Sequence, residues 1–308
     1  MKINISNFPK IKVGNYTDSQ AGTGCSVVLF EKPLAGSVSV MGGGPGSREL
    51  ALLDPTTAMD QINAVLLTGG SAFGLSAADG VIKYLEENNI GFDTDIAKIP
   101  IVPSAVIYDL NYKNSKIRPG SNEGYYACDT ANNEFYIGSW GVGTGATCGK
   151  LLGVDKASKS GLGFAENNSK NIKISALTVC NAVGNIINPE TGEIVAGIKS
   201  EDGFISYQEI VEKEFMNLFG MNTSLGVVIT NVKLDKAMLK KIALMAHDGL
   251  ARTVNPVHTM FDGDMIFVFS TNQVRADINK TGALAADAIS EAILNGIKAV
   301  KVDQEGEN

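Results

Sequence analysis

The sequence predicts a mixed fold of the α/β or α+β class, in which helices pack against stacked sheets. Short runs of branched and apolar residues, bounded by Gly and Pro, occur throughout the chain and indicate strands. Between them lie segments whose apolar residues recur every three or four positions, as in helices with one buried face. Hydrophobic residues make up 44%, charged residues 19% and Gly 34 of 308, which is typical of a compact, strand-rich enzyme. We expect one catalytic domain over residues 1–308.

The first third of the chain predicts three strands and a helix. Residues 25–30 and 36–41 are rich in branched side chains and predict two short strands, and the glycines and proline of residues 42–46 predict a loop after them. Residues 64–68 predict a buried strand. The following GGSAFG segment leads into a helix with apolar positions from Ala77 to Leu85 that ends near Asn88.

The middle third is less regular. Residues 99–108 are apolar and extended, with an interruption at Pro103, and residues 172–179 predict a core strand. Residues 141–150 are typical of a loop at their start and of a helix or turn at their end. Residues 199–222 are polar and weakly helical, so no firm element is predicted there.

The last third begins with an abrupt change from loop to buried strand at residues 222 and 223. Asp235 is placed to cap a helix whose apolar positions run from 238 to 250. Residues 265–270 predict another strand, and an Ala-rich amphipathic pattern predicts a closing helix at about residues 281–300.

Charge and cysteine usage exclude several classes of function. The net charge is −7 and no Lys/Arg-rich tract occurs, so nucleic acid is not expected as a partner. The N-terminus lacks the apolar stretch of a signal peptide and no run is long enough to span a bilayer, so we expect no membrane association and a cytoplasmic location. The four cysteines form no C-x-x-C pair, which predicts buried reduced thiols and no zinc or redox centre: Cys25, Cys128, Cys148 and Cys180.

Two glycine-rich segments were compared with nucleotide-binding motifs. A phosphate loop ending at Lys150 requires Gly at 144 and Ser or Thr at 151, but the chain has Thr144 and Leu151. The segment at 69–74 follows a predicted strand, as a dinucleotide fingerprint does, but its glycine spacing is wrong and favours a tight turn. We therefore expect no nucleotide and no other cofactor.

Several polar residues are candidates for chemistry. Asp262 and Asp264 are separated by one glycine, and on an extended segment they face the same side, although an Asp-Gly turn explains them equally well. His247 and His258 do not have the spacing of a metal motif. His247 follows the helical pattern, whereas His258 keeps a Ser-His-Asp type of hydrolase open.

Three segments together resemble the DmpA-type peptidases, a family that includes L-aminopeptidase/D-esterases, β-peptidyl aminopeptidases and nylon-oligomer hydrolases. They are LTGGSAFGLSAADG at 67–80, AHDGLAR at 246–252 and PVHTMFDGD at 256–264. The resemblance extends over nearly the whole chain. It implies a four-layer α-β-β-α sandwich of the α+β class, similar to that of N-terminal-nucleophile hydrolases, and a homo-oligomer, commonly a tetramer.

The resemblance also implies a cleavage site and a nucleophile. It places self-cleavage between Asn222 and Thr223, directly before an apolar strand, which would give chains 1–222 and 223–308. Thr as the nucleophile, with Asp262 and Asp264 as the paired acids, is similar to the nylon-oligomer hydrolase branch. The aminopeptidase branch has a Ser and a Glu in the corresponding segment.

Three further site residues are implied in the same way. Asn181 resembles the Asn of the family's oxyanion site, where its amide would donate a hydrogen bond to the developing negative charge. Lys150 resembles a lysine found near the nucleophile in the nylon-oligomer hydrolase branch. Tyr108 resembles an active-site tyrosine.

These residues predict a hydrolase of peptide or small-molecule amide substrates that acts through an acyl-Thr223 intermediate. Cleavage frees the α-amine of Thr223, whose ordinary pKa of about 7.7 to 8.0 suits a general base at neutral pH. Two alternatives use the same sequence features. One is an acyltransferase of the ornithine acetyltransferase type, and the other is an unprocessed, inactive relative.

Overall fold

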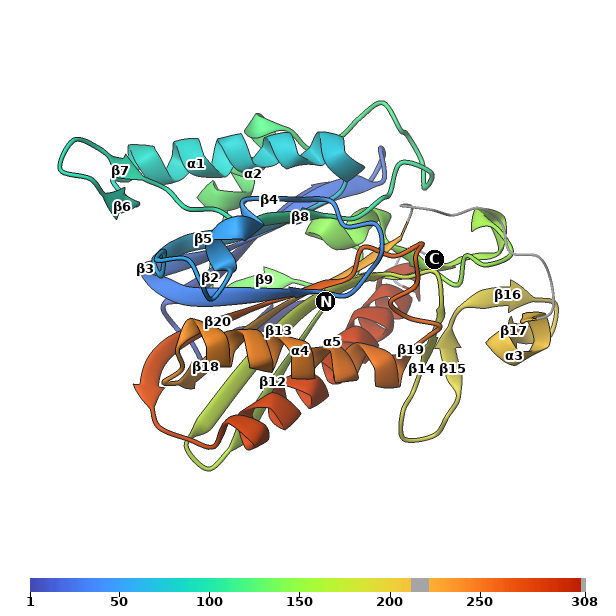
Figure 1. The fold of residues 1–308 in the computed structure, drawn as a ribbon. Helices are drawn as coiled ribbons and strands as arrows, with labels where there is room; N and C mark the ends of the chain where they lie inside the picture. The colour runs from blue at the N-terminus through green and yellow to red at the C-terminus, as the bar shows by residue number, and fades with distance from the viewer. Residues whose placement is uncertain (212–221, 306–308) are drawn as a thin grey trace.

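The chain folds into four layers, with a pair of helices on each outer face and two stacked sheets between them (Figure 1). The structure is a computed structural model that describes residues 1–211 and 222–305. One outer layer contains α1 (Ala77–Glu87) and α2 (Ser121–Asp129), and the other contains α4 (Lys236–Thr253) and α5 (Ile278–Glu305). This arrangement confirms the four-layer α-β-β-α fold.

Both sheets share the long strand β3 (Thr23–Val40). The first half of β3 belongs to the sheet next to α1 and α2, together with β2 (Ile11–Asp18), β5 (Ile62–Thr68), β8 (Ser104–Val106) and β4 (Ser47–Arg48). The second half belongs to the sheet next to α4 and α5, together with β20 (Met265–Val274), β18 (Thr223–Val232), β13 (Ile172–Asn181) and β12 (Leu162–Ser169).

The prediction of two separate strands at residues 25–30 and 36–41 was therefore wrong. Pro33 and Gly36 have the composition of a turn, but the chain crosses between the sheets there without leaving extended conformation. The register of β3 against β5 shifts between Leu29 and Leu34, where this crossing occurs. A proline is tolerated because the pairing is interrupted at that point.

Apolar side chains fill the three spaces between the layers. Strand residues alternate between the two faces of each sheet, so every sheet contributes to two of these clusters. Burial of each large side chain stabilises the fold by about 1.5–3 kcal/mol. The cluster between the two sheets includes Val28, Phe30, Val65, Leu67, Leu177, Val227 and Phe267.

Short elements form the edges and connections. Residues 141–150 differ from the prediction, because their start is a 3-10 helix and their end a short strand. The polar, weakly helical segment 199–222 contains a hairpin at residues 198–205 and a short helix at Tyr207–Ile210, and residues 212–221 lie outside the described residues. The short strands are β1 (Lys2–Asn4), β6 (Phe92–Asp93), β7 (Lys98–Ile99), β9 (Glu134–Tyr136), β10 (Thr147–Cys148), β11 (Ser158–Lys159), β14 (Asn185–Ile187), β15 (Ile194–Ala196), β16 (Ile198–Ser200), β17 (Gly203–Ile205) and β19 (Val254–Asn255), and the short helices are η1 (Leu50–Leu53), η2 (Ser71–Ser76), η3 (Gly141–Gly145), η4 (Val154–Lys156) and α3 (Tyr207–Ile210).

The long helices agree with their sequence patterns. The carboxylate of Asp235 accepts a hydrogen bond of 2.8 Å from the N–H of Met238, so it caps α4 as predicted. The closing helix α5 is longer at both ends than the predicted range of 281–300. No helix in the described part of the chain has the length and hydropathy to span a membrane.

Candidate active site

One parallel strand pair places the predicted cleavage site beside the paired acids. Strands β18 and β20 are joined through α4 and run parallel, so both begin at the same edge of their sheet. Residues just before these strands are therefore neighbours, and Asn222 forms an isolated bridge with Asp262. Strand β13 runs antiparallel to β18 and ends at this same edge, where Asn181 pairs with Thr223.

The predicted scissile bond lies inside the protein. Asn222 is fully buried and Thr223 is 3% exposed. The hydroxyl of Thr223 donates a hydrogen bond of 2.5 Å to the carbonyl oxygen of Asn222. The N–H of Gly263 donates to the same carbonyl oxygen at 2.8 Å. The hydroxyl of Thr223 and a backbone donor thus both contact the carbonyl group of the predicted scissile bond.

Gly263 has room for no side chain at this point. A Cβ there would lie 2.7 Å from Oγ1 of Thr223 and 2.6 Å from the carbonyl oxygen of Gly44. Gly44 belongs to the glycine-rich loop after β3, and its N–H donates to the carbonyl oxygen of Asp262. The absence of a Cβ lets the segment between the two acids approach the hydroxyl of Thr223 closely.

Asn181 and Lys150 form a buried pair next to Thr223. The amine of Lys150 donates to the side-chain oxygen of Asn181 at 2.8 Å and to its carbonyl oxygen at 3.0 Å. The side-chain amide of Asn181 donates to the carbonyl oxygen of Tyr108 at 2.9 Å. Burial lowers the pKa of Lys150 to about 8, against the opposing influence of nearby acids that include Asp262.

Asp262 is held by two backbone N–H groups and one hydroxyl. Its carboxylate accepts hydrogen bonds from the N–H of Val183 at 3.2 Å and the N–H of Thr259 at 3.1 Å. The hydroxyl of Thr259 also donates to it, at 2.5 Å. Burial, with a further contribution from Asp264, raises the pKa of Asp262 to about 6. The carboxyl group therefore titrates close to neutral pH.

Asp264 links strand β18 to His258. Its carboxylate accepts from the N–H of Ser224 at 2.6 Å, one residue after Thr223. The other carboxylate oxygen lies 2.8 Å from Nδ1 of His258 and accepts from the backbone N–H of that residue. Of the two acids, Asp264 is thus the one bonded to the strand that carries Thr223.

This contact supplies the Asp-His pair that the histidine-triad alternative requires. The third member of such a triad, a hydroxyl bonded to the imidazole, is not found in the part of the chain that the structure describes. Within the described residues, Nε2 of His258 is buried without a hydrogen-bond partner. The ring of His258 instead packs edge-on against His247, with the ring centroids 4.7 Å apart. Burial, followed by the proximity of His258, lowers the pKa of His247 to about 4, consistent with its predicted structural role.

Tyr108 contacts the site through its backbone carbonyl group. Its carbonyl oxygen receives the amide of Asn181, and the next residue, Asp109, is a buried acid that the sequence did not single out. Asp109 accepts from the hydroxyl of Thr23 at 2.6 Å and the N–H of Gly70 at 2.7 Å. The LTGGSAFG segment thus supplies a backbone donor to a buried carboxylate.

The remaining candidates for chemistry are the cysteine thiols, which are buried. All four cysteines are buried and free, as predicted. Burial raises the pKa of Cys180 to about 12, so this thiol, 3.5 Å from the hydroxyl of Ser224, is poorly nucleophilic. In residues 1–211 and 222–305, no cluster of three His, Cys, Asp or Glu side chains is arranged to bind a metal ion.

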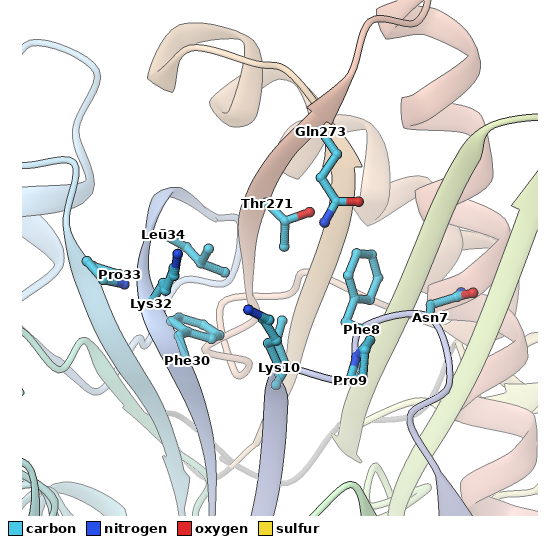
Figure 2. Close-up of a pocket in the computed structure, with 11 residues that line it drawn as sticks. Asn7, Phe8, Pro9, Lys10, Phe30, Lys32, Pro33, Leu34, Thr271 and Gln273 are labelled. Atoms are coloured by element: carbon cyan, nitrogen blue, oxygen red, sulfur yellow. The ribbon is translucent and has the colours of Figure 1, made fainter.

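A separate cavity of about 420 Å³ lies at the far end of the sheets (Figure 2). Its walls come from the N-terminal loop, the crossing region of β3 and the end of β20. Thr271 is seven residues beyond Asp264, which corresponds to about 20 Å along an extended strand. The lining residues are Asn7, Phe8, Pro9, Lys10, Ile11, Phe30, Lys32, Pro33, Leu34, Thr271 and Gln273.

Comparisons with known proteins agree on one family. The profile of Peptidase family S58 matches residues 4–306. An uncharacterized aminopeptidase of Mycobacterium tuberculosis is 35% identical over 326 residues, covering 95% of this chain and 93% of the relative. A 6-aminohexanoate-oligomer endohydrolase of Kocuria sp. is 28% identical over 312 residues, covering 95% and 85%.

A solved structure supports the fold assignment. The L-aminopeptidase D-Ala-esterase/amidase of Ochrobactrum anthropi, a variant of the N-terminal-nucleophile hydrolase fold, superposes with a TM-score of 0.71 at 16% identity, covering 94% of this chain and 84% of the other. The family match and the named relatives, independently of this superposition, make the protein a hydrolase of peptide or amide bonds. The chain belongs to Peptidase family S58.

Proposed function

We propose that the protein is a self-cleaving amide hydrolase in which Thr223 first breaks its own peptide bond to Asn222 and then serves as the catalytic nucleophile. The observation that carries this proposal is the contact between the hydroxyl of Thr223 and the carbonyl oxygen of Asn222, at 2.5 Å. A hydroxyl held against the adjacent carbonyl is at high effective concentration for attack on that group.

Self-cleavage has two balanced steps. Oγ1 of Thr223 bonds to the carbonyl carbon of Asn222 while the C–N bond breaks, and the hydroxyl proton passes to the departing nitrogen. This gives an ester between the two residues and a free amine on Thr223. Water then hydrolyses the ester, which restores the hydroxyl of Thr223 and leaves a carboxylate on Asn222. The products are chains of residues 1–222 and 223–308, which remain one catalytic domain.

The burial of the site supports cleavage as an activation step. Thr223, Asn181, Lys150, Asp262 and Asp264 are each at most 3% exposed while the chain is intact. A substrate carbonyl has no access to Oγ1 while the carbonyl of Asn222 is in contact with it. Cleavage removes this covalent obstruction and creates the amine that acts as general base.

The surrounding side chains have separate roles in the proposal. Asn181 donates to the oxyanion of the substrate through its amide, and its orientation is fixed because Lys150 occupies its oxygen. Asp264 holds the strand of the nucleophile through the N–H of Ser224. Lys150 balances the charge of Asp262.

The substrates that we propose are peptides or other linear amides. The two curated relatives described above are named an aminopeptidase and an oligomer endohydrolase, and both activities break linear amide bonds. We also propose a cytoplasmic homo-oligomer, a tetramer by family resemblance. Light scattering on the purified protein measures the number of chains directly.

An acyl-trapping experiment tests the catalytic step. The enzyme is mixed with an activated ester of a short amino acid, quenched in acid within milliseconds to seconds, and digested for mass spectrometry. We expect the acyl mass on Thr223 in the wild-type protein and not in Thr223→Ala. An adduct on another residue, with turnover retained in Thr223→Ala, would reject Thr223 as nucleophile.

The same experiment distinguishes hydrolysis from acyl transfer. We expect the adduct to decay in water alone, at a rate that added amine changes little. Decay that requires an amine acceptor would instead assign the acyltransferase reaction.

A further inference from the structure

The carbonyl of Asn222 is already held by a backbone donor before any chemistry occurs. The N–H of Gly263 donates to the carbonyl oxygen of Asn222 at 2.8 Å, so it already faces the oxygen on which negative charge develops during attack. The side-chain amide of Asn181, the donor expected from family resemblance, donates to the carbonyl oxygen of Tyr108 in the intact chain.

The N–H of Gly263 is fixed from both sides. Asp262 precedes it, and its carboxylate is anchored by Val183 and Thr259. Asp264 follows it, and its carboxylate is anchored by Ser224 and His258. A donor fixed in this way needs little reorganisation during the reaction, which is the condition under which an oxyanion donor is most effective. The paired acids thus position the amide that lies between them.

Cleavage changes what this donor faces. Asn222 then ends in a carboxylate beside Asp262, its bridge partner, and near Asp264. Lys150 offsets the charge of Asp262, so the new carboxylate adds an unbalanced negative charge beside it, and the low dielectric of the interior strengthens the resulting repulsion. Departure of the new C-terminus relieves this repulsion and leaves the N–H of Gly263 without its acceptor.

We infer that the N–H of Gly263 stabilises the oxyanion in both reactions, first on Asn222 during self-cleavage and then on the substrate carbonyl that takes the place of the Asn222 carbonyl. This inference rests on the proposed function. It assigns the acyl position of the substrate to the space that Asn222 occupies in the intact chain.

Replacing Gly263 with glycolic acid tests the inference, because this exchange substitutes an ester oxygen for the N–H and adds no atoms. The matched control is glycolic acid at Gly43, whose N–H donates to the carbonyl oxygen of Thr259 at 3.2 Å in the adjoining loop. Both variants are followed by intact mass during cleavage, and their kcat and KM are measured after prolonged incubation has completed it.

We expect the Gly263 ester to slow both self-cleavage and kcat by about 10²–10³-fold, with KM little changed, while the Gly43 ester resembles the wild type. Equal rates for the two esters would overturn the inference. Slowing of cleavage alone would also overturn it, because the donor would not be shared. Cleavage of Thr223→Ala at the same bond would reject the proposed function itself, whatever the esters do.

A second measurement does not depend on the folding of an ester variant. In the mature wild-type enzyme, a peptide aldehyde adds the hydroxyl of Thr223 across its carbonyl and places an oxygen where the oxyanion forms. We expect the amide proton resonance of Gly263 to move downfield on binding of the aldehyde. An unchanged Gly263 resonance, with the adduct confirmed by mass, would contradict the inference.

Discussion

At the scale of single residues, the site combines a buried amine and a buried acid that both titrate near neutral pH. Burial lowers the pKa of Lys150 to about 8 and raises that of Asp262 to about 6. Between these values the amine is largely protonated and the acid largely ionised, so the two opposite charges stabilise each other. Protonation of Asp262 at low pH removes this ion pair, and any activity that depends on the pair is lost with it.

We predict that turnover by the mature enzyme falls as the pH drops through about 6. The folded pKa of Asp262 lies above its ordinary value of 3.8, so the carboxylate is lost at a higher pH than in the unfolded chain. For the same reason, protonation of Asp262 raises the free energy of unfolding as the pH falls from about 6 towards 4. A rate profile from pH 4.5 to 8, with fluorescence as the control for unfolding, measures the effect. A flat profile down to pH 4.5 would exclude a role for ionised Asp262.

Two substitutions at Asn181 test the role of its side-chain amide in catalysis and in stability. Asn181→Asp keeps acceptors for Lys150 and the N–H of Thr147 but replaces the side-chain NH₂, and with it the hydrogen bond to the carbonyl oxygen of Tyr108, so we expect a less stable but folded protein with kcat lowered by about 10²-fold. Asn181→Ala also leaves Lys150 short of an acceptor, which costs about 1–3 kcal/mol of unfolding free energy. Urea unfolding and steady-state kinetics measure both variants. Wild-type kcat in Asn181→Asp would show that its amide donates nothing to the reaction.

We predict that His258→Asn remains active. The asparagine retains a side-chain N–H for Asp264, whereas a catalytic imidazole would be lost. Turnover assays of this variant beside Thr223→Ala decide the question. A His258→Asn protein that folds and self-cleaves but does not turn over substrate would favour the histidine triad.

The sequence indicated the identity of the site residues better than their contacts. Tyr108, Lys150, Asn181, Thr223 and the two acids belong to one region, as their resemblance to the family implied. The donor role of Gly263 and the anchoring of Asp109 were not predictable, because they depend on backbone N–H groups. Every residue except proline has such a group, so the sequence carries no signal for which one lies at the site.

At the scale of elements, periodicity located most strands and helices, and failed where tertiary pairing overrode local composition. β5, β13, β18 and α4 agree with their patterns because their apolar faces are buried in the layers that the patterns imply. β3 was divided wrongly because a strand that changes sheets has the composition of a turn at the crossing. η3 was missed because its glycines also suit a loop.

We predict that Gly69→Ala lowers the unfolding free energy by about 2–4 kcal/mol, since a Cβ at Gly69 would lie 2.1 Å from a carboxylate oxygen of Asp109 and 2.5 Å from the hydroxyl of Thr23. The control is Gly192→Ala, at a position with φ of +75° and nothing within 4 Å of the added Cβ. That variant should lose only about 1–2 kcal/mol, from backbone strain. Urea denaturation compares them. Equal losses would mean that the turn at Gly69 adapts and does not hold Asp109 tightly.

At the scale of the whole molecule, the site depends on the register between distant segments. Asn222 and Asp262 are 40 residues apart, and Asn181 and Thr223 are 42 apart, yet the sheet brings each pair together. The sequence pattern predicted the strands but not that β18 and β20 pair in parallel within an otherwise largely antiparallel sheet, because periodicity does not report strand partners. The family resemblance predicted the four layers, and the structure shows which strands are neighbours within them (Figure 1).

Intact mass of the purified, denatured protein, alongside Thr223→Ala, tests the proposed self-cleavage most directly. Dividing 32.4 kDa in proportion to 222 and 86 of the 308 residues gives fragments of about 23 and about 9 kDa. We predict these two fragments for the wild type, with Thr at the N-terminus of the smaller one, and a single chain for Thr223→Ala. A wild-type chain that stays intact after long incubation, or a variant that is cleaved at the same bond, would contradict Thr223 as the self-processing nucleophile.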